Sequence, residues 1–156
     1  MKLLIAVDLS ESTEKIVKKA EDIASRLSAG VWLLHVVHPE PADFYIGGRK
    51  PESDGFEMDP QSYRDSLAKR YHREHRQLQE IADRFRKTGI DTTALLVEGD
   101  TVETILKEAS KLDVDMIIAG SHGRGAMYQL LVGSSSEGVL QKSARPVLVI
   151  PTHDRT

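Results

Sequence analysis

The chain has 156 residues, with 21 lysines and arginines against 24 aspartates and glutamates, so its formal net charge is −3 and its pI is about 6.1. This balance leaves no electrostatic footprint for nucleic acid. No apolar run reaches the ~20 residues that cross a bilayer, the apolar start is too short for a secretory leader, and the absence of cysteine excludes disulfides and thiolate zinc sites. We therefore expect a cytoplasmic protein with one domain over residues 1–156, no nucleic-acid partner and no membrane insertion.

Strand and helix patterns alternate through the first part of the chain. Leu3–Val7 is a continuous apolar run, which is typical of a strand covered on both faces. Apolar residues then recur at helical spacing over residues 16–27, and Gly30 ends that pattern. Val31–Val37 predicts a second strand. The alternation indicates a parallel sheet joined by crossover helices.

The second part of the chain repeats the alternation. A long helical pattern, from Leu67 to Phe85, stops at Gly89, and Asp100 with Glu103 forms a capping-box pair that begins another helix. The remaining strands are predicted at 93–97, 116–119 and 147–150. Because crossovers are right-handed, the natural fold class is α/β, with a single open, doubly wound, Rossmann-like parallel sheet of five strands.

Residues 39–63 interrupt this pattern. They include four of the six prolines, three glycines and six acidic residues. Such a composition cannot contribute to a core, so we expect a flexible insertion at about 39–62. The insertion leaves the carboxyl end of the second strand, the edge where ligands bind in such sheets, and it is therefore either a mobile lid or a tolerated surface loop.

The most informative segment follows the fourth strand, where Gly120, Gly123 and Gly133 precede Ser134 with the spacing Gly-2x-Gly-9x-Gly-Ser. Glycines let backbone N–H groups approach a ligand closely, and a helix that starts at Ser134 adds unsatisfied N–H groups and a positive dipole end. Together they predict a site for an anion, best suited to the phosphates of a nucleotide. Gln141 rules out a P-loop, and no glycine follows the first strand as a dinucleotide fingerprint requires.

With this motif, the chain resembles the ATP-binding branch of the universal stress protein family. The same resemblance is carried by the opening Leu3–Asp8, the segment Leu33–Val36 and the closing Arg145–Pro151. It covers nearly all of the chain except about 39–62. It implies a strand order 3-2-1-4-5 and a small α/β domain, commonly a homodimer, that binds ATP or AMP, with ADP and Mg²⁺ as further candidates, and acts in stress responses.

In that strand order the direction of winding reverses between the first and fourth strands, so the loops that follow them leave a crevice. By resemblance, Asp8 contacts the ribose of the nucleotide. A carboxylate there also suits the Mg²⁺ of a metal-bound nucleotide, or it bonds local N–H groups at the start of a helix. Ala6 and Val7 are expected to line the base pocket, together with Val36, whose backbone contacts adenine in the family. His35 is expected to be a hydrogen-bonded core histidine.

The loop after the fourth strand supplies the remaining candidates. Gly120 can reach the sugar, and the N–H groups of Gly123 and Gly133 face the phosphates. Ser134 and Ser135 combine backbone donors with hydroxyls, although Ser134 with Glu137 also forms an ordinary capping box.

Two charged or titratable residues of this loop have alternative roles. His122 is expected to have a structural or positioning role rather than act as a general base, because no serine–acid pattern surrounds it. Arg124 either steadies the terminal phosphate or is an exposed loop residue.

These features favour an ATP-binding regulatory or stress-response protein whose nucleotide occupancy changes its conformation or its binding to an unknown protein partner. One alternative is a slow ATP-hydrolysing or phosphotransfer enzyme. No residue is assigned as catalytic, because no Walker lysine, paired carboxylates or activated nucleophile accompany the glycines. The other alternative is a stress-response dimer that binds no nucleotide. A homodimer through 147–150 is expected, because this apolar strand lies at the edge of the sheet.

Overall fold

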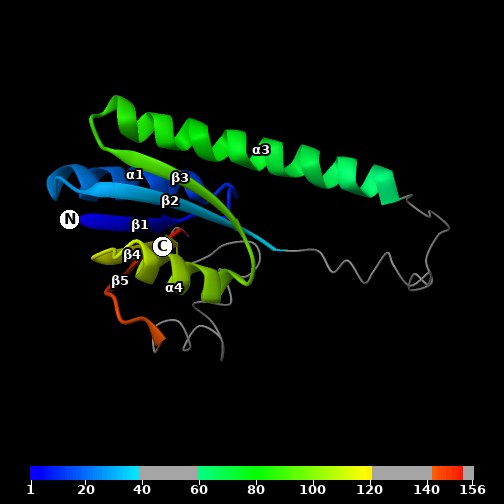
Figure 1. The fold of residues 1–156 in the computed structure, drawn as a ribbon. Coiled ribbons are helices and arrows are strands. Elements are labelled where there is room, and N and C mark those ends of the chain that lie inside the picture. Colours follow the sequence, from blue (N-terminus) through cyan, green and yellow to red (C-terminus); the bar gives the residue numbers. More distant parts are fainter. Residues whose placement is uncertain (39–59, 121–141, 153–156) are drawn as a thin grey trace.

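The computed structural model describes residues 1–38, 60–120 and 142–152. Their strands and helices follow one another in the predicted alternation (Figure 1): β1 Lys2–Ala6, α1 Thr13–Arg26, β2 Gly30–Val37, α3 Pro60–Lys87, β3 Thr92–Glu98, α4 Thr101–Lys111, β4 Met116–Gly120 and β5 Val147–Ile150. The strands form one five-stranded sheet of order β3-β2-β1-β4-β5 in which all neighbours are parallel. The predicted fold class and strand order are therefore confirmed.

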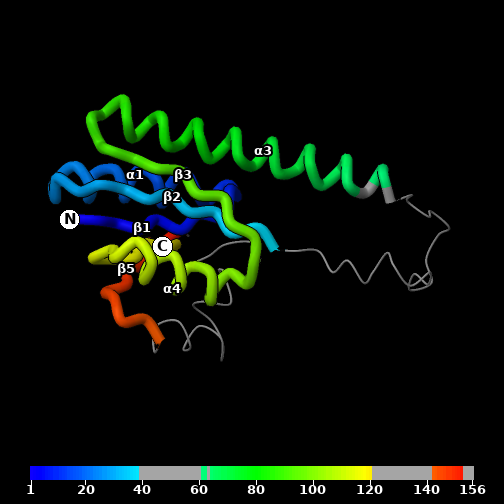
Figure 2. Tube along the Cα trace, in the orientation of Figure 1, coloured from blue at the N-terminus to red at the C-terminus, as the bar shows by residue number. Residues whose placement is uncertain are grey.

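The helices cover both faces of the sheet (Figures 1 and 2). An apolar cluster lies between the helices and each face. Successive side chains of a strand point to opposite faces. In β1, Leu3 and Ile5 therefore join a core cluster with α1 and α3, while Leu4 and Ala6 join a second cluster with α4. All four side chains are buried, which is why the sequence of this central strand is apolar without alternation.

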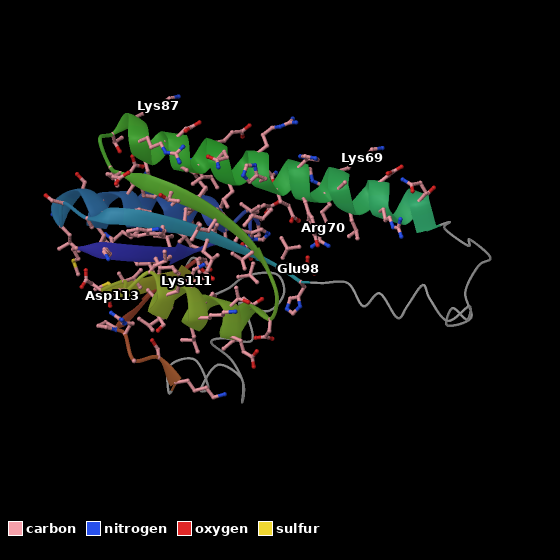
Figure 3. All side chains as sticks on the ribbon, viewed as in Figure 1. Lys69, Arg70, Lys87, Glu98, Lys111 and Asp113 are labelled. Carbon is pink, nitrogen blue, oxygen red and sulfur yellow. The ribbon has the colours of Figure 1, made fainter. Side chains whose placement is uncertain are left out.

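Helix α3 is longer than the sheet needs. Near its carboxyl end, Leu78, Ala82 and Phe85 recur at helical spacing and are fully buried against β2 and β3. The amino-terminal part extends past the strands and carries charged side chains such as Lys69 (Figures 2 and 3). The helix begins at Pro60, so the last residues of the expected insertion are helical, and residues 39–59 lie outside the described part of the chain.

Helix α4 begins as the capping pair predicted. The side chain of Asp100 accepts a hydrogen bond from the backbone N–H of Glu103 at 3.0 Å, which satisfies one of the N–H groups left unpaired at a helix start. Across residues 1–38, 60–120 and 142–152, no helix has both the length and the apolar character required to cross a membrane.

The strand registers show where the sheet opens. β1 pairs with β2 as far as Ala6 and Leu34, but it pairs with β4 only as far as Ile5 and Ile118. β4 continues to Gly120 alongside β5 instead. The first and fourth strands therefore separate at their carboxyl ends, and the switch point lies where the winding reverses.

Candidate functional site

The structure places five of the predicted site residues at the carboxyl ends of the central strands. Ala6 ends β1, Val7 and Asp8 follow it, Val36 lies near the end of β2, and Gly120 ends β4. The other six predicted residues lie outside the described part of the chain, so their roles remain predictions: His122, Gly123, Arg124, Gly133, Ser134 and Ser135.

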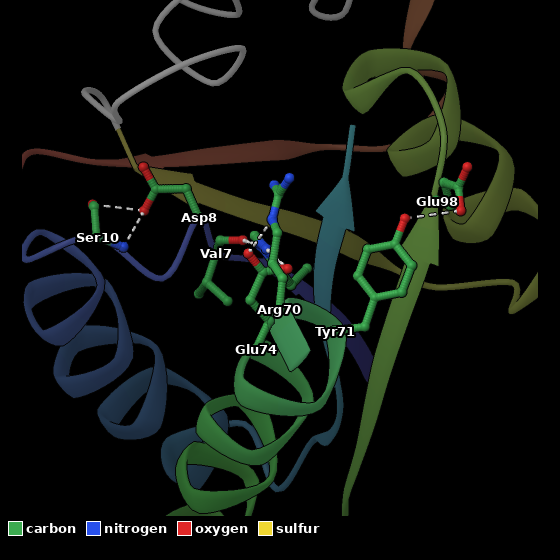
Figure 4. A network of polar contacts seen from close by, with 8 residues as sticks. Val7, Asp8, Ser10, Arg70, Tyr71, Glu74 and Glu98 are labelled. Carbon is green, nitrogen blue, oxygen red and sulfur yellow. Dashed lines mark hydrogen bonds and ion pairs between the residues drawn. The ribbon is translucent and has the colours of Figure 1, made fainter. Parts of the chain in front are cut away.

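One oxygen of the Asp8 carboxylate organises the start of α1. Asp8 Oδ1 accepts hydrogen bonds from the N–H of Ser10 at 3.0 Å, the hydroxyl of Ser10 at 2.7 Å and the hydroxyl of Thr13 at 3.2 Å. Figure 4 shows the two bonds from Ser10. The helix-entry role considered for Asp8 is therefore present.

The second oxygen is in a different position. Asp8 Oδ2 is buried and accepts no hydrogen bond from any residue that the structure describes. A buried carboxylate oxygen without a donor is unfavourable by about 1–3 kcal/mol, and buried polar atoms in native proteins nearly always have a partner. Since Oδ1 already fixes the orientation of the carboxylate, Oδ2 is left to accept a hydroxyl of a ligand or to bind a cation.

The turn between β1 and α1 is conformationally specialised. Leu9 has φ of 57°, in the left-handed region that residues other than glycine adopt at a cost of about 1 kcal/mol. Its side chain packs against the core cluster of α1 and α3, and the turn returns the N–H of Ser10 to Asp8. Core packing and the three bonds to Asp8 Oδ1 together maintain this conformation.

A polar chain connects the end of β1 to helix α3. The Nδ1 atom of His35 lies 2.9 Å from the carbonyl oxygen of Val7, and its Nε2 atom lies 3.7 Å from Oε2 of Glu74. Arg70 Nε donates to Glu74 Oε1 at 3.0 Å (Figure 4). The prediction of a buried, hydrogen-bonded His35 is confirmed, with 7% of the residue exposed. The part played by Glu74 and Arg70 was not predicted, and the only sequence signal for it is their spacing of four residues.

The three apolar residues expected at the base do not share a face of the sheet. Ala6 and Val36 pack in the cluster on the α4 side, whereas Val7 packs in the cluster with α1 and α3. Ala6 and Val7 are also almost fully buried. A ligand at this edge therefore meets backbone atoms of these residues, and only Val36 retains partial side-chain exposure.

Gly120 is a glycine for a reason that the motif did not reveal. A Cβ atom at this position would lie 2.5 Å from Cδ1 of Ile16 and 3.0 Å from Cγ2 of Thr152. Real Cβ atoms do not approach other heavy atoms so closely, so the end of β4 and helix α1 can pack at this distance only without a side chain. The space beside this glycine is filled by the protein itself.

Metal binding by protein groups alone has no support in the described residues, which contain no cluster of three or more histidine, aspartate or glutamate side chains arranged to hold an ion. Mg²⁺ at Asp8 would therefore draw its other oxygen ligands from a bound polyphosphate and water, as is common for this ion.

Comparison with known proteins extends the resemblance. Residues 1–151 match the profile of the Universal stress protein family. The chain is 29% identical over 157 aligned positions to universal stress protein MJ0577 of Methanocaldococcus jannaschii, covering 96% of this chain and 93% of that protein. It is 30% identical over 154 positions to putative universal stress protein SH1215 of Staphylococcus haemolyticus, covering 97% and 85%.

Solved structures agree with the fold. The structure of MJ0577 superposes with a TM-score of 0.71 at 26% identity, covering 99% of this chain and 97% of that one. A universal stress protein in complex with cAMP gives 0.61 at 19% identity, covering 98% of both chains. The protein from Archaeoglobus fulgidus in complex with dAMP gives 0.57 at 19% identity, covering 96% and 97%. At that level of identity, the last two comparisons establish a shared fold only.

Proposed function

The chain belongs to the universal stress protein family, and we propose that it is an ATP-binding regulatory member whose nucleotide occupancy changes its conformation or its binding to a protein partner. The observation that carries the proposal is Asp8, whose buried Oδ2 has no donor among the described residues although its Oδ1 has three. A ribose hydroxyl would supply the missing hydrogen bond.

The position of Asp8 supports a nucleotide in particular. The carboxylate lies beside the point where β1 and β4 separate, and the loop with Gly123, Gly133 and Ser134 begins directly after β4. A sugar at Asp8 would therefore lie near the end of β2 and at the strand end from which the loop predicted to bind phosphates continues. Structural relatives were solved with cAMP and dAMP, which are both adenine nucleotides.

We propose ATP as the ligand, with AMP or ADP as alternatives and Mg²⁺ carried by the phosphates. Hydrolysis is expected to be slow. Backbone N–H groups stabilise a bound phosphate similarly in the ground and transition states, which strengthens binding more than it accelerates reaction. The proposed assembly is a homodimer through β5, which is the edge strand next to β4.

The test is a thermal shift assay on protein freed of bound ligand, with ATP, ADP or AMP and with or without Mg²⁺. At ATP near 100 times Kd, binding to the folded state contributes about 2.7 kcal/mol. For a chain of this size the melting temperature should rise by roughly 5–10 °C. No shift with any of the three nucleotides at millimolar concentration would contradict nucleotide binding. It would favour the alternative function, a stress-response dimer that binds no nucleotide.

A matched pair of variants assigns the binding to Asp8. Asp8→Asn replaces one carboxylate oxygen with a donor and removes the charge, so ATP affinity should fall about 10–100-fold, corresponding to the ~1.5–3 kcal/mol of a hydrogen bond to a charged group. Asp100→Asn makes the same chemical change at the start of α4, where aspartate and asparagine are equally good N-cap residues. It should leave the affinity unchanged. Equal affinities of the two variants would argue against Asp8 as a ligand.

A further inference from the structure

The ladder between β1 and β2 ends in an irregular way. The N–H of Val7 donates to the carbonyl of Leu34 at 2.9 Å, which continues the parallel pairing by one bond beyond Ala6. In a regular parallel ladder the next bond would run from the N–H of Val36 to the carbonyl of Val7, because alternate residues of a strand direct their peptide groups to the same neighbour. The described residues do not form that bond. The carbonyl of Val7 accepts from the ring of His35 instead, at 2.9 Å.

We propose that His35 is a positioning residue of the nucleotide site. By occupying the carbonyl of Val7, its ring keeps the backbone N–H of Val36 out of the ladder and leaves it directed into the space beyond the end of β1. This inference rests on the proposed nucleotide binding. In that binding, the backbone of Val36 contacts adenine, as the family resemblance implies, and the inference adds the role of His35 in keeping the N–H of Val36 free for the base.

The ring is held in the orientation that this role needs. A carbonyl oxygen only accepts, so His35 Nδ1 carries a hydrogen and the ring cannot rotate without losing this bond. On its other side, Nε2 faces Glu74, whose side chain is 13% exposed and is itself held by Arg70 at 3.0 Å. Glu74 of α3 therefore lies beside the Nε2 edge of the ring, with Oε2 buried and without a hydrogen bond among the described residues. Figure 4 shows Arg70 bonded to Glu74.

The same geometry explains why the site includes α3. The three polar contacts run from Arg70 through Glu74 and His35 to Val7, which directly precedes Asp8. Movement of Glu74, whose Oε2 lies 3.7 Å from Nε2, would give the ring room to turn away from Val7, and the carbonyl of Val7 would then become an acceptor for Val36. If Val36 bonded to Val7, its N–H would no longer be available to the base. Helix α3 would therefore affect binding of the base without contacting it.

The first experiment uses the protein without nucleotide and measures hydrogen exchange at the Val36 amide by NMR. His35→Leu removes the ring donor, so the ladder should close and exchange at Val36 should slow at least ~10-fold relative to the wild-type protein. His35→Asn places an amide donor close to the position of Nδ1 and should keep the wild-type rate. A Val36 amide that exchanges equally in the wild-type and His35→Leu proteins would overturn the proposal. A through-hydrogen-bond coupling between Val36 N and the Val7 carbonyl carbon in the wild-type protein would overturn it without any variant.

The second experiment measures the affinities of adenosine, ATP and inorganic tripolyphosphate by calorimetry. His35→Leu should weaken adenosine and ATP by the same factor, about 10-fold for one hydrogen bond, and leave tripolyphosphate unchanged. Glu74→Ala, which removes the side chain beside Nε2, should produce the same pattern with a smaller factor, and His35→Asn should restore the binding lost in His35→Leu. An equal loss for all three ligands would indicate a general structural defect and refute a positioning role.

The matched control is Glu14→Gln. It breaks the ion pair between Glu14 of α1 and Arg84 near the other end of α3, where the guanidinium donates at 2.6 and 2.9 Å. This variant should bind all three ligands like the wild-type protein. If the wild-type protein binds neither adenosine nor ATP, the proposed function fails, whereas exchange at Val36 in the free protein still decides the inference about His35.

Discussion

Replacing Gly120 with alanine tests the close packing between the end of β4 and helix α1. The new Cβ would lie 2.5 and 3.1 Å from Cδ1 and Cγ1 of Ile16, and 3.0 Å from Cγ2 of Thr152. Ile16 is 1% exposed, so its side chain must move within a filled core. Inserting atoms into such a core destabilises by about 1–3 kcal/mol. For a chain of this length, a destabilisation of about 2 kcal/mol lowers the melting temperature by roughly 4–8 °C.

Gly30→Ala is the matched control in the same sheet. A Cβ at Gly30 would meet its nearest neighbours, Trp32 and the carbonyl of Asp91, only at 3.9 and 4.0 Å, which is ordinary contact. This substitution should leave stability unchanged or raise it by up to ~1 kcal/mol, because alanine restricts the unfolded chain. The free energy of unfolding of both variants is measured by urea denaturation and compared at an unchanged m-value. Equal stabilities of Gly120→Ala and Gly30→Ala would refute the packing argument.

A double-mutant cycle identifies the clashing atom. Ile16→Val removes the Cδ1 methyl group and should cost about 0.5–1.5 kcal/mol in the wild-type background. In the Gly120→Ala background the same change should cost less or even restore stability, since it removes the atom nearest to the new Cβ. Additive effects would show that Ile16 is not the source of the strain.

Three further predictions concern surface electrostatics, assembly and the glycine loop. The hydrogen bond from Arg84 lowers the pKa of Glu14, so the pair stabilises the fold above the ordinary carboxyl pKa of about 4.3 and loses this contribution as the pH falls through the lowered value. The side chains of Arg84 and Glu14 are substantially exposed, at 43% and 64%, so Glu14→Gln should lower the free energy of unfolding, measured by urea denaturation, by at most ~0.5 kcal/mol at pH 7 and not at all in strong acid. An equal loss of stability at both pH values would contradict the pairing. Light scattering at micromolar concentration should report about twice 17.4 kDa, and Val149→Lys, at a half-buried position of β5, should shift the protein towards monomer; a wild-type monomer would refute the proposed interface. Gly133→Val should abolish ATP binding with the fold intact, whereas Ser134→Ala should weaken ATP binding by near 1 kcal/mol because backbone donors remain. A larger loss of binding in Ser134→Ala than in Gly133→Val would contradict phosphate binding by backbone N–H groups.

The fold was predictable from the sequence because each strand and helix has a local reason to form. The central strand is apolar without alternation, since both of its faces are covered by helices. The start of α4 was readable from Asp100 and Glu103 alone. Once strands alternate with helices, handed crossovers leave few arrangements, and the family resemblance specified the observed order.

The site was less predictable, because its contacts join residues that are distant in the sequence. The contact between His35 and Glu74 spans two elements, and nothing near either residue indicates the other. The packing of Gly120 against Ile16 likewise depends on the distance between a strand and a helix. Periodicity predicts which face of an element is buried but not the separation of two elements, and therefore it could not reveal why Gly120 carries no side chain.

Helix α1 is attached to both strands that separate at the switch point, and this constrains how a ligand there could act on the protein. Thr13 donates to Asp8 at one side, and Ile16 packs against Gly120 at the other. Both residues are buried, so the ends of β1 and β4 are fixed to the same helix. Binding there should cost little reorganisation of these edges, since a preformed site needs less ordering.

Among the described residues, we therefore expect a conformational response to the proposed nucleotide in elements that contact the switch point without belonging to the core. The amino-terminal part of α3 meets this condition. Its Glu74 lies beside His35, which bonds to Val7 at the end of β1, while most of the side chains before Glu74 are at least partly exposed. Local stability is lowest where few apolar contacts are buried. We therefore expect amide exchange in α3 to be faster before Glu74 than around Phe85, and ATP to slow exchange in that first part of the helix. Nucleotide binding without any change there would exclude α3 as the responding element.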